Sequence, residues 1–138
     1  MGPSPAYDLF IGTWILDPES LKYEHGKPGL RAVYTVERAS RGLTFSLDAD
    51  DPDGNLLKFV YGGPVDGVDR EISPGVTLSL GWVDPFTIES VLKRGGKVAD
   101  RWTRTVSPDD PDRMLIAQTG VTPQGNPFTN RSTYYKTS

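Results

Sequence analysis

The chain has 138 residues, of which 36% are hydrophobic and 24% charged, and its formal net charge is -3 at pH 7. These values are typical of a soluble globular protein and argue against a disordered or fibrous chain. The length suits one core but not two ordinary ones, so we expect a single domain over residues 1–138. The acidic excess argues against a nucleic-acid partner, and the absence of cysteine excludes disulfides, thiolate nucleophiles and cysteine-ligated metals.

The N-terminal segment carries no targeting signal that we recognise. Residues Met1–Ala6 lack a basic stretch followed by an apolar run, and Ala6 stands where a myristoylation motif requires Ser or Thr. No uninterrupted apolar stretch approaches the length of a membrane span. We therefore expect a cytoplasmic protein without a membrane span, and the sequence leaves open whether it forms homo-oligomers.

Turn residues divide the chain into short segments. The 15 glycines and 12 prolines fall in clusters between β-branched and aromatic runs, which is typical of hairpins. The pattern predicts an all-β fold, an antiparallel up-and-down barrel of about eight to ten strands with minimal helix. We expect one helical turn near Tyr7–Phe10 and another at Asp17–Ser20, where Asp17 suits a cap and Pro18 the first helical position.

Two polar segments in the first half of the chain contain residue types that can bind metals, but their spacing does not fit a metal site. The only histidine, His25, lies in the loop-like segment Glu24–Pro28 and has no second ligand at metal spacing. The acidic segment Asp48–Gly54 superficially resembles a calcium loop, but Pro52 occupies a ligand position and no Glu follows at the twelfth position. We therefore predict a solvated loop histidine, a charged hairpin tip, and no metal, haem or other cofactor.

Alternation of apolar residues predicts which side of each later strand faces inward. In the segment from Val76 to Trp82 the even-numbered residues are apolar, and the same parity holds from Phe86 to Leu92. A three-residue connection, Val83–Pro85, would keep both apolar faces on one side. The even-numbered residues are therefore expected to line the interior.

The glycine pair Gly95–Gly96 decides how the next strand pairs, because hairpin loop length sets the register. A two-residue loop would split the apolar residues between the two faces. A three-residue loop instead pairs Leu92 with Val98 and Ile88 with Trp102, and we prefer it. The inward residues are then expected to continue as follows: Val98, Asp100 beside Ser90, Trp102, Arg104, Val106, Met114, Ile116, Gln118, Phe128, Asn130, Ser132 and Tyr134.

A motif near the N-terminus resembles a known superfamily. The segment Phe10–Leu16 contains Gly12-Thr13-Trp14, which is similar to the opening of the calycins, the superfamily of lipocalins and intracellular fatty-acid-binding proteins. Further short pieces resemble bacterial lipocalin-like proteins of uncharacterised function: Asp17-Pro18-Glu19-Ser20, Lys97-Val98, Arg104-Thr105-Val106-Ser107 and Tyr134-Tyr135-Lys136.

This resemblance implies a role for Trp14. In calycins the tryptophan packs across the closed end of the barrel, and a basic residue of the last strand often covers it. Arg131 and Lys136 are the candidates here. A first strand that pairs with the last also needs a large anchor where the two meet. We therefore expect Trp14 to serve structure rather than ligand contact.

Inward polar and aromatic residues suggest a cavity rather than a dry core. Our first hypothesis is a binding protein for a small, largely hydrophobic molecule. An alternative is a cofactor-independent enzyme, a cyclase or isomerase, in which an inward carboxylate such as Asp100 acts as base. A third is a filled barrel that binds another protein. The candidate ligand-binding residues are Tyr34, Tyr61, Trp82, Ser90, Asp100, Trp102, Arg104, Gln118, Asn130, Ser132 and Tyr134.

Arg104 is the most specific of these candidates. The predicted register places it beside Ile116, which in turn lies beside Ser132, with Tyr134 two residues further along. We predict that Arg104, Ser132 and Tyr134 form a polar station that orients one end of the ligand, the alternative being an arginine that points to solvent. Fatty-acid-binding proteins carry an Arg-x-Tyr at this place in the last strand, and Ser132 replaces that arginine, which argues against a fatty acid.

Overall fold

The computed structural model describes residues 7–137, so our interpretation of Met1–Ala6 lies outside the described residues. The chain forms a short 3-10 helix and ten strands. Their bounds are η1 Tyr7–Leu9, β1 Gly12–Lys22, β2 Ala32–Ala39, β3 Gly42–Asp50, β4 Leu56–Gly63, β5 Arg70–Ser73, β6 Val76–Asp84, β7 Thr87–Arg94, β8 Lys97–Ser107, β9 Asp110–Val121 and β10 Pro127–Lys136. In this part of the chain, no helix is long and apolar enough to span a bilayer.

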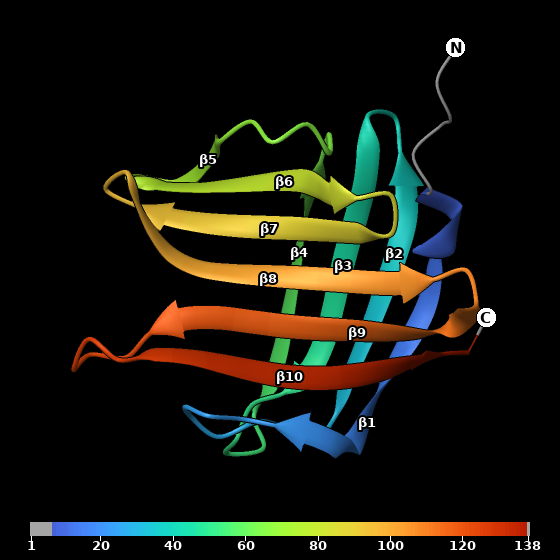
Figure 1. Cartoon of the computed structure of the whole chain (residues 1–138), viewed down its shortest axis with the longest axis horizontal. Helices are drawn as coiled ribbons and strands as arrows, with labels where there is room; N and C mark the ends of the chain where they lie inside the picture. Colours follow the sequence, from blue (N-terminus) through green and yellow to red (C-terminus); the bar gives the residue numbers. More distant parts are fainter. Residues whose placement is uncertain (1–6, 138) are drawn as a thin grey trace.

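All ten strands belong to one antiparallel sheet in the order β4-β3-β2-β1-β10-β9-β8-β7-β6-β5. Strands that follow each other in the chain are neighbours, except that β4 and β5 are the two edges, and β1 pairs with β10. In Figure 1, β6 to β10 run across the front of the molecule and β2 to β4 cross behind them, so the sheet curls into two layers. The prediction of an all-β, up-and-down barrel with minimal helix is confirmed.

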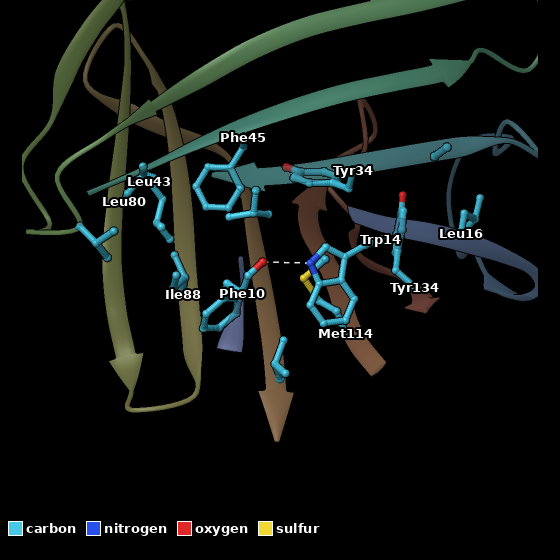
Figure 2. Close-up of a cluster of buried hydrophobic side chains, with 14 of the residues drawn as sticks. Phe10, Trp14, Leu16, Tyr34, Leu43, Phe45, Leu80, Ile88, Met114 and Tyr134 are labelled. Carbon is cyan, nitrogen blue, oxygen red and sulfur yellow. Dashed lines mark hydrogen bonds between the residues drawn. The ribbon is translucent and has the colours of Figure 1, made fainter. Parts of the chain in front are cut away.

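One end of the curled sheet is packed around Trp14. Its side chain is fully buried, and its indole Nε1 donates a hydrogen bond of 2.9 Å to the carbonyl oxygen of Phe10, as Figure 2 shows. Trp14 pairs with Lys136 of β10, whose Nζ lies 5.5 Å from the centre of the indole ring. Trp14 is thus the expected anchor between first and last strands, and Lys136, not Arg131, covers it.

The segment Asp17–Ser20 corrects one expectation, because it belongs to β1 and is not a helical turn. The register between β1 and β10 shifts between Asp17 and Lys22, which marks a bulge. Asp17 still caps locally: its Oδ1 accepts from the backbone N–H of Glu19 at 3.0 Å, and its carbonyl accepts from the Ser20 hydroxyl at 2.6 Å. The turn-forming residues therefore bend a strand instead of starting a helix. The turn expected near Tyr7 is present as η1.

The Gly95–Gly96 hairpin corrects a second expectation. Its loop has two residues, since Arg94 pairs with Lys97, and the φ angles of +58° and +81° at the glycines suit the type I′ turn. A bulge then shifts the register between Leu92 and Lys93 and restores the inward face. We did not foresee that bulge, and for that reason we chose the wrong loop length.

The bulge changes the pairings but leaves the inward parity intact. Ile88 pairs with Arg104 rather than Trp102, and Asp100 lies opposite Leu92 rather than Ser90. Val98 was expected inside and is exposed, because the two-residue loop pairs it with Lys93 rather than with Leu92.

At the β6–β7 hairpin the connection is likewise shorter than the three residues expected. Asp84 pairs with Thr87, which leaves Pro85 and Phe86 in the turn, and Phe86 is exposed instead of inward. Beyond these turns the register is as predicted: Val106 pairs with Met114, Arg104 with Ile116 and Ile116 with Ser132.

Candidate functional site

Away from the Trp14 end, the two layers enclose a cavity of about 560 Å³. Its volume lies within the range of pockets for small organic molecules. Nine of the eleven candidate residues line it: Tyr34, Tyr61, Ser90, Trp102, Arg104, Gln118, Asn130, Ser132 and Tyr134. The shared parity of the later strands brings most of these side chains together, as the sequence pattern indicated.

Several lining residues were missed as site candidates. They are Tyr23, Leu47, Phe59, Val60, Ile72, Leu78, Leu92 and Ile116. Leu47, Phe59 and Tyr61 share the inward parity of β3 and β4, since Leu47 pairs with Phe59 and Phe45 pairs with Tyr61. The alternation of apolar and polar residues in β3 and β4 was the sequence signal that could have identified Leu47 and Phe59. Tyr23 and Ile72 belong to a loop and a short edge strand, where periodicity says little.

The cavity reaches the surface beside the two sheet edges. Val60 and Phe59 of β4 are 67% and 46% exposed, Ile72 of β5 is 56% exposed, and all three line the cavity. Because β4 and β5 are the strands that the sheet leaves at its edges, the opening lies at the side of the barrel.

Arg104 is the centre of the polar part of the cavity. Its side chain is buried at 3% exposure, so it does not point to solvent. Nη1 donates to the Ser90 hydroxyl at 2.6 Å, and Nη2 donates to the Tyr34 hydroxyl at 2.8 Å and to the Tyr61 hydroxyl. Nε also donates to Tyr34, at 3.3 Å. The two tyrosine hydroxyls are hydrogen-bonded to each other.

These partners differ from the ones the sequence suggested. No hydrogen bond joins Arg104 to Ser132 or Tyr134 within the described residues, although Ser132 lines the cavity and Tyr134 packs edge-on against Tyr34, ring centres 6.0 Å apart. Arg104 instead reaches across the barrel to β2 and β4 and sideways to β7. Arg104 is therefore the centre of a polar cluster, but Ser132 and Tyr134 are not its hydrogen-bond partners as predicted, because cross-strand neighbours give no information about the opposite layer of the sheet.

Aromatic rings complete the surroundings of the guanidinium group. The Arg104 Cζ lies 4.8 Å from the ring centre of Phe45 and 5.4 Å and 5.5 Å from those of Tyr34 and Tyr61. Such contacts favour a cation through the negative faces of the rings. No acidic side chain is ion-paired with Arg104 anywhere in residues 7–137.

Burial and neighbouring groups shift the pKa values of Arg104, Tyr61 and Tyr134. Burial works to lower the pKa of Arg104, but the surrounding tyrosine oxygens outweigh it, and the net pKa lies above the usual value. Burial raises the pKa of Tyr61 and of Tyr134, so both phenols keep their protons. The cluster thus combines a positive charge with neutral hydroxyl groups.

A count of hydrogens shows what the cluster offers a ligand. Tyr34 and Tyr61 carry one hydroxyl hydrogen each, and one of these lies in the bond between them. Both oxygens accept from Arg104, so the second phenol hydrogen is left to donate. The cluster is therefore suited to a ligand group that accepts hydrogen bonds.

Asn130 lines the cavity, but its amide is already used for structure. Its Oδ1 accepts from the backbone N–H groups of Glu24 and His25 at 2.9 Å and 3.2 Å, and its Nδ2 donates to the His25 carbonyl at 3.0 Å and to Gln118 Oε1 at 3.4 Å. Asn130 thus fixes the loop between β1 and β2. His25 is exposed in that loop, as expected, and its ring lies 5.0 Å from that of Phe128.

The other two candidates do not line the cavity. Trp82 packs in the closed end against Tyr7 and Phe10, with ring centres 5.5 Å and 6.0 Å apart, because it lies at the end of β6 nearest η1. Asp100 lies two pairs beyond the pair of Trp102 and Gln118, and its Oδ1 accepts from Gln118 Nε2 at 3.4 Å. Asp100 therefore has the inward parity, but it is not among the residues that line the cavity, where the enzyme hypothesis needed a carboxylate.

Across residues 7–137, no group of three or more His, Asp or Glu side chains lies close enough together to hold a metal ion.

No protein-family model and no curated protein matches the chain. Solved structures do, over nearly its whole length. Zebrafish ileal bile-acid-binding protein in complex with cholic acid has a TM-score of 0.57 at 12% identity, covering 94% of this chain and 99% of that one. The fold is calycin-like.

Two redesigned β-barrels are also similar to this chain in fold. One has a TM-score of 0.56 at 14% identity and covers 100% of both chains. The other, bound to DFHBI, has a TM-score of 0.52 at 15% identity and covers 96% of this chain and 100% of its own. At these identities the likeness concerns the fold, and the similarity to bacterial lipocalin-like proteins stays a prediction.

Proposed function

We propose that the chain binds a small, largely apolar molecule inside the barrel and orients it by an acceptor group, a carbonyl or carboxylate, placed on Arg104 and the surrounding hydroxyls. One observation carries this proposal: a buried arginine without an acidic partner faces a cavity of about 560 Å³. Within residues 7–137 this cation has hydrogen-bond partners but no counter-charge, which makes it a candidate for binding an acceptor group of a ligand. The structural neighbours that hold cholic acid and DFHBI support the use of such a barrel for a small molecule.

The apolar part of the cavity supports the same proposal. Leu47, Leu78, Leu92 and Ile116 line it together with Trp102, so most of a ligand's surface would meet hydrocarbon or aromatic side chains. The acceptor end would then supply the orientation, and the apolar body most of the affinity.

The test uses a matched pair of probes, decanoic acid and its methyl ester, with affinities measured by calorimetry on wild type and Arg104→Gln. We expect the substitution to weaken the acid about tenfold or more and the ester much less, since a charged hydrogen bond contributes more than a neutral one. Arg101→Gln is the matched control, because Arg101 lies on the outer side of β8, paired with Glu89 at 3.2 Å. Equal losses for both probes, or none, would overturn the orienting role of Arg104. Native mass spectrometry of the protein purified from its own host would identify a retained ligand directly.

A further inference from the structure

Strand β8 carries a second unpaired charge on the inward face, Asp100. Neither Asp100 nor Arg104 takes part in any ion pair found in residues 7–137. The two residues are four positions apart on one strand, which separates their backbones by roughly 13 Å. The inward face of β8 therefore has a positive group deep in the barrel and a negative group near its far end.

A glycine gives the Asp100 carboxylate its place. Asp100 pairs with Leu92 on one side and Gly120 on the other. A Cβ atom at Gly120 would lie 2.8 Å from Asp100 Oδ1 and 2.8 Å from the ring of Phe128, closer than side-chain contacts allow. The missing side chain at Gly120 thus lets the carboxylate lie over the inward face of the sheet.

Gln118 connects this carboxylate to the cavity. Gln118 lines the cavity, and its Nε2 donates to Asp100 Oδ1 while its Oε1 accepts from Asn130 Nδ2, both at 3.4 Å. Asn130 is held in turn by the loop at His25, so the orientation of the Gln118 amide is fixed. Within the described residues, Asp100 Oδ2 has no hydrogen-bond partner. The partly buried carboxylate lies beside Gln118, next to the residues that line the cavity, and it can accept a further hydrogen bond there.

We propose that Asp100, positioned by Gln118, is a second recognition point that accepts a hydrogen bond from a donor or cationic group at the far end of the ligand. The inference rests on the proposed function, because the ligand's acceptor end must lie on Arg104. The ligand class is then an elongated apolar molecule with polar groups of opposite character at its two ends, such as an ω-amino acid. Trp102, which lies between the two charges on β8 and lines the cavity, contacts its apolar middle.

The experiment compares ω-aminodecanoic acid with decanoic acid on wild type and Asp100→Asn, with dissociation constants measured by calorimetry at low salt. Asparagine keeps the shape and the acceptor oxygen for Gln118 but removes the charge. We expect Asp100→Asn to weaken ω-aminodecanoic acid about tenfold and to change decanoic acid by less than about twofold. Asp112→Asn is the control, since it removes the same charge from an exposed site on β9.

The outcomes separate the two proposals. If Asp100→Asn changes both probes equally, or neither, while decanoic acid still depends on Arg104, the second recognition point is wrong and the proposed function stands. If neither probe binds the wild-type protein, the proposed function fails, and this inference fails with it. Thermal unfolding of each variant shows whether a loss reflects binding or folding. Gln118→Glu offers a second variant, because its carboxylate still accepts from Asn130 Nδ2 but no longer donates to Asp100 Oδ1 and repels it.

Discussion

The closed end and the cavity are built from the same strands with the same alternation, yet their inward residues differ. Around Trp14 the inward side chains are apolar and tightly packed, and the indole hydrogen is bonded to Phe10. Around Arg104 the inward residues include hydroxyls, amides and an unpaired charge, beside partly exposed rings such as Phe59. The comparison teaches that the start of β1 and the end of β10 are packed for stability, whereas the middle of β8 places a buried cation that no carboxylate of residues 7–137 pairs with.

The largest expected effect is at the closed end. Trp14→Ala removes a fully buried indole and its hydrogen bond to Phe10, and we expect it to lower the free energy of unfolding by about 4 kcal/mol. Urea unfolding followed by far-ultraviolet circular dichroism measures the change. The control is Ile15→Ala on the neighbouring, exposed position of the same strand, with an expected loss below about 0.5 kcal/mol. A loss below about 1 kcal/mol for Trp14→Ala would mean that the anchor is not where the barrel's stability lies.

A second expected effect is the pH dependence of stability that the buried tyrosines of the cavity region cause. The pKa values of Tyr61 and Tyr134 are raised by burial, so in the folded state these phenols hold their protons more tightly than in the unfolded state. Unfolding then releases protons once the pH exceeds the unfolded value of about 10, and stability must fall as the pH rises further. The expected slope is about 1.4 kcal/mol per pH unit for each tyrosine.

Urea unfolding at a series of alkaline pH values measures that slope. Tyr61→Phe or Tyr134→Phe should reduce it by one tyrosine's share, because each removes one of the buried phenols. Tyr135→Phe is the control, since Tyr135 is exposed. A slope that both buried substitutions leave unchanged would contradict the burial of these hydroxyls.

Much of the fold could be predicted because alternation is a local signal. The parity from Val76 onward, the pairing of Arg104 with Ile116 and the anchor at Trp14 all follow from residues near each other in sequence or from the first and last strands. The turns were harder. A bulge can restore a face after either loop length, so the inward face at Gly95–Gly96 did not determine the loop.

Most residues of the candidate site could be predicted from the sequence, but their hydrogen-bond partners could not. Side chains on the inward face were identified by parity, yet Tyr34 and Tyr61 meet Arg104 only because β2 and β4 cross behind β8, as Figure 1 shows. Trp82 has the right parity but lies at the wrong end of its strand. Parity reports which side of a sheet a residue occupies, while distances across the barrel depend on how the sheet curls.

The smallest expected effect concerns access to the cavity. Ile72 is exposed at the sheet edge on β5, and it lines the cavity together with Val60 of β4. Since the chain has no cysteine, Ile72→Cys creates a single thiol that a bulky maleimide can modify. We expect the label to slow association of decanoic acid severalfold in stopped-flow measurements of tryptophan fluorescence, because Trp102 lines the cavity. The dissociation rate should slow similarly, because the same opening serves both directions, so the dissociation constant changes little.

Leu115→Cys is the control, since it carries the same label on an exposed residue of β9, and it should leave both rates unchanged. If the two labelled proteins bind and release decanoic acid at equal rates, the ligand does not enter or leave between β4 and β5.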